Sequence, residues 1–188
     1  MYLFFDGVST SGYIWFFWED KTCIAQESFL IWGNESSKAT PLIDNFLKKN
    51  AISYEQIQNI ITVVWPGSFT GIRTVSLIIN TLAYIYPHIS LSPVNFFDLY
   101  RSYPIVKASS KRDLFVKWEK SATIEVVSNQ FFEENLVWSL IFWDINMERF
   151  QREIELNSKR DYENVLNNIT LQDLKKIAPL YIKKPNIS

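Results

Sequence analysis

The chain has 188 residues, of which 47% are hydrophobic and 21% charged, and its formal net charge is -1. This composition is typical of a folded protein, and the near-neutral charge disfavours a protein that grips nucleic acid by a basic surface of its own. One cysteine, Cys23, excludes an internal disulfide, and one histidine, His88, leaves no Cys/His cluster for zinc. Aromatic residues make up 16% of the chain, which suggests an aromatic surface for a protein partner.

The first residues do not have the pattern of a signal peptide. Residues 1–5 carry no basic side chain, and Asp6 interrupts the apolar run. No apolar run reaches the length of a membrane span. The expected location is therefore cytoplasmic.

Three antiparallel strands and a helix are predicted at the start of the chain. Residues 2–5 and 13–18 are apolar runs separated by Gly, Ser and Thr, which predicts a β-hairpin. Residues 23–31 predict a third strand, in which Cys23 is expected to be a small buried side chain. Residues 38–49 are amphipathic and predict a helix, with Pro41 in its first turn.

The next segment predicts a helical turn, a strand and the main helix. Ser53 and Gln56 have the spacing of a capping box, which indicates a short turn before a strand over 57–64. Residues 68–86 are apolar nearly all round and predict a helix that Pro87 ends. His88 is expected to cap this helix end with its side chain.

The second half of the chain has weaker patterns. A strand over 89–91 and a helix over 93–103 are expected before Pro104, which marks the predicted boundary between domains 1–103 and 104–188. Strands are then predicted at residues 105–108, 113–119, 123–127 and 136–143. A short helix over residues 171–177, with Thr170 as its N-cap, is predicted near the C-terminus.

The run V-W-P-G-S-F-T-G-I-R at residues 64–73 leads directly from the predicted strand into the main helix. Free backbone N–H groups at a helix N-terminus can bind phosphate, so a nucleotide loop is the first interpretation to test. No Lys follows Gly71 as a P-loop requires, and the spacing is not that of a dinucleotide fingerprint.

Residues 66–73, PGSFTGIR, resemble the PGSFTG-[ILV]-R signature of the TsaB (YeaZ) family, whose members assist threonylcarbamoylation of a tRNA adenosine beside the anticodon. Asp6 after the first strand also matches the family pattern, although Gly7 replaces its usual Thr. The C-terminal residues Pro179, Tyr181, Ile182 and Lys183 resemble its Pro-x-Tyr-[LI]-[RK] ending. The resemblance implies an α/β fold, with an actin-like (ribonuclease H-like) lobe that contains a mixed five-stranded sheet, followed by a shortened second lobe of related type.

The resemblance also implies a non-catalytic subunit that binds a TsaD-like catalytic partner through helices 38–49 and 68–86. It implies a homodimer when the chain is alone, contact with tRNA only through the complex, and no membrane. A TsaE-like ATPase is a further expected partner, and ATP is expected only within the complex, with no cofactor or metal held by the chain itself. The expected interface residues are Pro66, Gly67, Ser68, Phe69, Thr70, Gly71, Arg73, Leu77, Asn80 and Tyr84.

Distinct roles are expected for these interface residues. Ser68, Phe69 and Thr70 would shape the turn and cap the helix, and the two glycines would permit close backbone approach. Arg73 and Asn80 would give polar specificity within an apolar contact. A helix that is apolar nearly all round can instead be buried on both sides within its own domain, and the residues leave this alternative open.

Asp6 and Thr10 offer a different function. The pattern Asp6-Gly7-x-x-Thr10-x-Gly12 is similar to the first phosphate loop of actin-like kinases, which would make the chain an ATP-dependent phosphotransferase. The same residues are also the usual ones of a hairpin turn. A peptidase-like activity is a third possibility, for which the sequence offers no nucleophile and base pair, so no catalytic residue is assigned.

Overall fold

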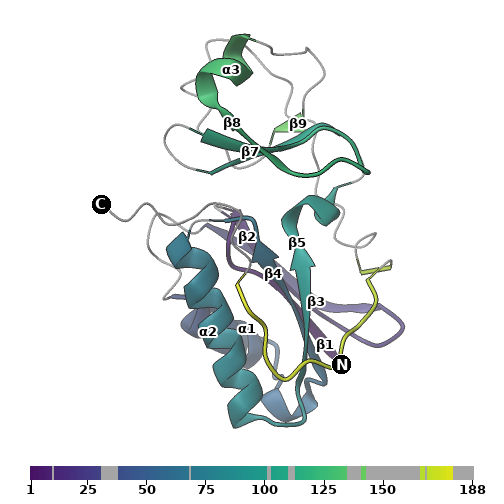
Figure 1. Cartoon of the computed structure of the whole chain (residues 1–188). Helices are drawn as coiled ribbons and strands as arrows, with labels where there is room; N and C mark the ends of the chain where they lie inside the picture. Colours follow the sequence, from purple (N-terminus) through teal and green to yellow (C-terminus); the bar gives the residue numbers. More distant parts are fainter. Residues whose placement is uncertain are drawn as a thin grey trace. The chain divides into compact units, whose positions relative to one another are not determined.

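The structure is a computed structural model, and it describes residues 1–9, 11–30, 38–67, 69–100, 103–109, 113–134, 141–142, 166–167 and 169–179 (Figure 1). The chain divides into two compact units. The first comprises Met1–Phe96 and Leu166–Ser188, and the second comprises Phe97–Val165. Across the described ranges, no helix combines the length and apolar character needed to cross a membrane.

Five strands form the sheet of the first unit, in the order β3-β2-β1-β4-β5. The strand β1 pairs antiparallel with β2 and parallel with β4, β3 adds antiparallel to β2, and β5 adds parallel to β4. The prediction of a mixed five-stranded sheet is therefore confirmed. The strands are β1 (Tyr2–Asp6), β2 (Ser11–Phe17), β3 (Cys23–Leu30), β4 (Asn59–Trp65) and β5 (Ser90–Asn95).

Two α-helices, α1 (Ala39–Lys49) and α2 (Phe69–Ile85), accompany this sheet, and a 3-10 turn, η2 (Tyr54–Gln56), precedes β4. The predicted capping box is present: the Ser53 N–H donates to Gln56 Oε1 at 2.8 Å. The Tyr54 hydroxyl donates to Asp44 Oδ1 of α1. Burial, reinforced by this hydrogen bond, raises the pKa of the Tyr54 phenol, so the phenol remains a proton donor that ties η2 to α1.

One face of the sheet and the inner sides of both helices form a single apolar core. Alternate residues of a strand point to the same face, so β1, β2 and β4 each contribute every second side chain. In α2 the buried side consists of Ile72, Val75, Ile79 and Leu82. The core members from these elements include Leu3, Phe5, Ile14, Phe16, Ile43, Leu47, Ile60, Val64, Val75 and Ile79.

The segment that follows α2 differs from the prediction of a strand over 89–91 and a helix over 93–103. The structure has the longer strand β5 and only a 3-10 turn, η3 (Phe96–Leu99). Pro93 lies within β5. Since β5 is the last strand in the sheet order, Pro93 can occupy it without depriving a further strand of a hydrogen bond.

The predicted helix over 171–177 is wrong. This stretch is not helical, and Leu174 forms an isolated antiparallel bridge with Leu91 of β5, in which the Leu91 N–H donates to the Leu174 carbonyl at 2.8 Å. We call residues 169–179 the C-terminal strap. The strap belongs to the first unit, whereas the predicted second domain, 104–188, contained it.

The second unit has its own sheet, in the order β8-β7-β6-β9. Its strands are β6 (Ile105–Ala108), β7 (Asp113–Lys117), β8 (Glu125–Ser128) and β9 (Ile141–Phe142), with α3 (Asn129–Glu134) between the last two. β7 is antiparallel to both β6 and β8, and β9 is parallel to β6. The connectivity thus repeats that of β1, β2, β3, α1 and β4. Most of the strand predicted at 136–143 lies outside the described residues.

We expect Gly12→Ala to destabilise the protein. A Cβ at Gly12 would lie 2.1 Å from the Phe29 ring and 2.8 Å from the Asp6 backbone oxygen, and the strand backbone cannot move aside as a ring can. Overpacking of this kind costs about 1–3 kcal/mol in the free energy of unfolding, measurable by urea denaturation. Gly67→Ala is the comparison variant and should cost less, since its nearest contacts would be Ile72 Cγ1 at 3.1 Å and Val8 Cβ at 3.2 Å. A Gly12→Ala midpoint equal to that of the unsubstituted chain would contradict this account.

Candidate functional site

The PGSFTGIR run lies where β4 ends and α2 begins, beside the β1–β2 turn. Parallel pairing of β1 with β4 places the carboxyl ends of both strands at one edge of the sheet. The two turns approach closely, because a Cβ at Gly67 would lie 3.2 Å from Val8 Cβ and 3.1 Å from Ile72 Cγ1. Pro66 is buried and follows a cis peptide bond, and Ser68 lies outside the described residues. Gly67 therefore serves close packing within the chain.

Asp6 is fully buried at the end of β1. Its Oδ1 accepts hydrogen bonds from the backbone N–H groups of Val8 and Ser9, each at 3.3 Å. This is the turn-stabilising role that Asp commonly has. Thr10, the other residue of the suggested phosphate loop, lies outside the described residues. These two hydrogen bonds are of the kind that the hairpin-turn alternative predicts.

His88 and Cys23 differ from their predicted environments. His88 Nε2 lies 3.3 Å from the Tyr54 carbonyl oxygen of η2, whereas a cap on the last carbonyls of α2 was expected. Cys23 is exposed, because β3 is an end strand of the sheet. Within the part of the chain that the structure describes, no three His, Cys, Asp or Glu residues are grouped so that they could hold a metal ion.

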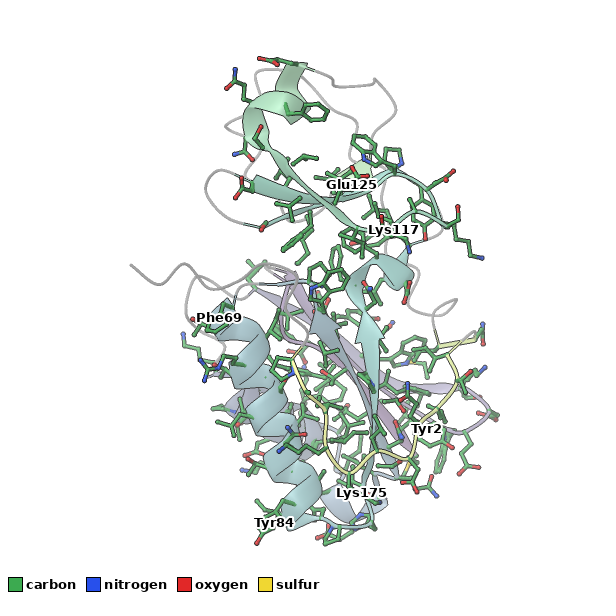
Figure 2. The ribbon with its side chains drawn as sticks, viewed as in Figure 1. Tyr2, Phe69, Tyr84, Lys117, Glu125 and Lys175 are labelled. Carbon is green, nitrogen blue, oxygen red and sulfur yellow. The ribbon has the colours of Figure 1, made fainter. Side chains whose placement is uncertain are left out.

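The side of α2 that points away from the sheet is exposed. We call Phe69, Arg73, Leu77 and Tyr84 the α2 outer face, since their spacing of four, four and seven residues places them along one side of the helix. Leu77 is 67% exposed, Tyr84 85% and Phe69 41%. Figure 2 shows Phe69 and Tyr84 at opposite ends of α2. The alternative of a helix buried on both sides within its own domain is therefore wrong.

Arg73 supplies the charge on the α2 outer face. Its guanidinium carbon lies 5.1 Å from the centre of the Phe69 ring, a cation–π arrangement. The sequence of α2 contains no acidic residue. Thr70 and Gly71 lie in the first turn of the helix, the former exposed and the latter half-buried. The outer face thus combines a large apolar area with one cation, and it can bind an apolar surface that carries a carboxylate.

Asn80 has a different environment from the rest of the predicted interface. Its Nδ2 donates to the Ile177 carbonyl oxygen at 2.9 Å, and its Oδ1 accepts from the Ile177 N–H at 2.8 Å. The amide therefore binds the C-terminal strap. Sequence reasoning missed this role, although an amide side chain, which can both donate and accept as a backbone peptide group does, was a signal that it pairs with a backbone segment.

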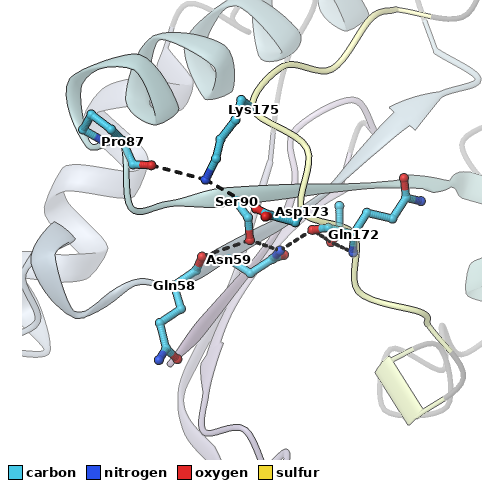
Figure 3. A network of polar contacts seen from close by, with 8 residues as sticks. Gln58, Asn59, Pro87, Ser90, Gln172, Asp173 and Lys175 are labelled. Atoms are coloured by element: carbon cyan, nitrogen blue, oxygen red, sulfur yellow. Dashed lines mark hydrogen bonds and ion pairs between the residues drawn. The ribbon is translucent and has the colours of Figure 1, made fainter.

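The strap is also held along β4 and β5 (Figure 3). The Gln172 N–H donates to Ser92 Oγ at 2.8 Å, and Asn59 Nδ2 donates to the Gln172 carbonyl oxygen at 3.0 Å. Further along, Lys175 Nζ donates to the Pro87 carbonyl oxygen at 3.3 Å. The strap thus runs from the sheet edge to α2.

Comparison with solved structures finds proteins of the same fold. One is an uncharacterized protein with similarity to peptidase YEAZ from Pseudomonas aeruginosa, with a TM-score of 0.57 at 12% identity over 68% of this chain and 66% of the neighbour. Another is YeaZ from Pseudomonas aeruginosa, with a TM-score of 0.54 at 11% identity over 68% of this chain and 64% of the neighbour. The chain thus spans slightly under two-thirds of each neighbour. No family model and no curated protein matches the sequence. The likeness establishes a fold shared with YeaZ.

We expect Asp6→Ala to lower the free energy of unfolding by about 1–3 kcal/mol, because two backbone N–H groups lose a buried acceptor. Thermal and urea unfolding would measure this loss. Asp20→Ala is a matched control, since Asp20 Oδ1 also accepts a backbone N–H, that of Thr22, but in an exposed turn where water can replace it. Equal destabilisation by the two substitutions would refute the structural role of Asp6.

Proposed function

We propose that the chain is a non-catalytic subunit, similar to TsaB, that binds a TsaD-like catalytic partner. Through that partner it supports N6-threonylcarbamoyladenosine modification of tRNA next to the anticodon. The observation that carries the proposal is the exposed α2 outer face, which begins within the PGSFTGIR run in a fold shared with YeaZ. Exposed apolar surface of this kind marks protein interaction sites.

The proposed subunit acts by binding and makes no bonds itself. A partner that contacts the α2 outer face in only one of its own conformations is shifted toward that conformation by the difference in binding free energy. The apolar side chains supply the hydrophobic contact, and Arg73 fixes its register by pairing with a carboxylate. Under this proposal tRNA, a TsaE-like ATPase and any ATP associate with the complex, and the chain works in the cytoplasm.

Charge favours a different protein as partner over a second copy of this chain. Lys48 is exposed at the end of α1, and Arg73 is exposed on α2. The acidic residue of α1, Asp44, accepts the Tyr54 hydroxyl. If two copies faced each other through α1 and α2, the cationic side chains of both copies would come close together. The carboxylate of α1 already accepts a hydrogen bond, and α2 has no carboxylate to neutralise them. We therefore expect the homodimer of the isolated chain to be weaker than the complex with the catalytic partner.

Leu77→Glu tests the proposed surface. A carboxylate placed in the middle of an apolar contact must be desolvated on binding, so we expect at least tenfold weaker association with the TsaD-like partner. Leu30→Glu is the matched control, because Leu30 is 62% exposed on β3, an end strand of the sheet, compared with 67% for Leu77. Light scattering after size exclusion, with and without the partner, measures both variants. A strictly monomeric unsubstituted chain in both mixtures would overturn the proposed function.

Arg73→Glu tests the charge of the proposed contact. Reversal places two carboxylates against each other, so we expect at least tenfold weaker partner binding, whereas Arg73→Lys retains the charge and is expected to cost less. Binding by the unsubstituted chain should also weaken as salt concentration rises. Titration calorimetry at two salt concentrations provides the measurement. Equal affinities of the Glu and Lys variants would show that no carboxylate faces Arg73.

A further inference from the structure

The C-terminal strap borders the α2 outer face. Asn80 is three residues after Leu77 and four before Tyr84, so it lies beside both on the helix surface. Both polar atoms of its amide bond Ile177, and Ala178, the next residue of the strap, is exposed. A protein seated on Leu77 and Tyr84 would therefore lie next to the end of the strap.

The strap is fixed at both ends by buried groups. Ile177 is 2% exposed and belongs to the same apolar core as Ile79 of α2 and Leu91 of β5. At the other end, the Ser92 hydroxyl, which is also buried, accepts the Gln172 N–H. Detachment of the strap would uncover part of the core beside α2 and leave Asn80 without its backbone partner. The attached strap thus completes the packing of the core beside α2.

We propose that the strap is a positioning element for the α2 outer face and that its attachment is coupled to partner binding. This inference rests on the proposed function and adds a regulatory element to it. The partner is a protein surface that is apolar opposite Leu77 and carries a carboxylate opposite Arg73, because the outer face has a single cation and α2 lacks acidic residues. Such a partner binds the form with the strap attached, and by linkage it stabilises that form.

Ser92→Ala tests the strap without changing any residue of the α2 outer face. Ser92 lies on β5, and its hydroxyl bonds the strap at Gln172. Thr62→Val is the matched control, because the Thr62 hydroxyl is also buried in the sheet but donates to the Phe5 carbonyl oxygen of β1. In the full chain, we expect Ser92→Ala to speed amide exchange at Gln172 and Ile177 and to weaken binding of the TsaD-like partner by roughly three- to tenfold, since only the attached fraction binds. Thr62→Val should leave exchange at these two residues and partner binding close to the unsubstituted values.

Asn80→Ala provides the second measurement. It replaces Ser92→Ala in the test if circular dichroism shows that Ser92→Ala does not fold. The Asn80→Ala variant should speed amide exchange at Ile177 and weaken partner binding by the same roughly three- to tenfold. In the unsubstituted chain, the bound partner should slow amide exchange at Ile177. Strap variants that exchange faster yet bind as tightly as the unsubstituted chain would overturn the coupling while leaving the proposed function intact. Unchanged exchange in both variants would also overturn it. An unsubstituted chain that fails to bind the partner removes the proposed function and the coupling together.

Discussion

The first unit depends on the packing of one sheet face against the inner sides of α1 and α2. β1 lies at the centre of the sheet, with β2 and β4 as its neighbours, and its residues 3–6 are buried. The helices that cover the core bury one side each, and α2 is apolar on its other side as well. Fully burying one leucine side chain contributes about 1.5–3 kcal/mol. The exposed Leu77 and Tyr84 therefore leave a hydrophobic free energy of burial that the packing of the first unit does not use.

The same packing explains why the turn before α2 is rich in small residues. Parallel pairing of β1 and β4 forces their turns together, and glycine at position 67 leaves room for Val8 and Ile72. Glycine at position 7 is explained in a similar way, since a Cβ there would lie 2.4 Å from the Phe5 ring. Apolar groups thus occupy the space around these turns. The result is a closely packed start for α2, which fixes the direction in which Phe69 and Arg73 emerge.

The local patterns of the sequence predicted most of the first unit. Alternating and helical periodicities located β1, β2, α1, β4 and α2 to within a few residues, and the Ser53–Gln56 capping box was found from its spacing alone. The outer face of α2 was predictable for the same reason, because helical spacing alone aligns its residues. Interactions between distant segments were not predictable. Pro93 and Cys23 were misjudged because strand order decides which strands lie at an edge, and no local pattern records that order.

The missed role of Asn80 has the same origin, since its partner is 97 residues away in the sequence. An extended chain that leaves a sheet edge and crosses a helix loses its hydrogen-bonding partners, because the helix backbone satisfies its own N–H and C=O groups. An amide side chain presents one donor and one acceptor, as a peptide group does. Asn80 therefore lets the strap pass from Leu91 of β5 to the surface of α2 without leaving the polar groups of Ile177 unpaired. A leucine at this position would fit the apolar helix equally well, but it would leave the strap without an attachment beside Leu77 and Tyr84.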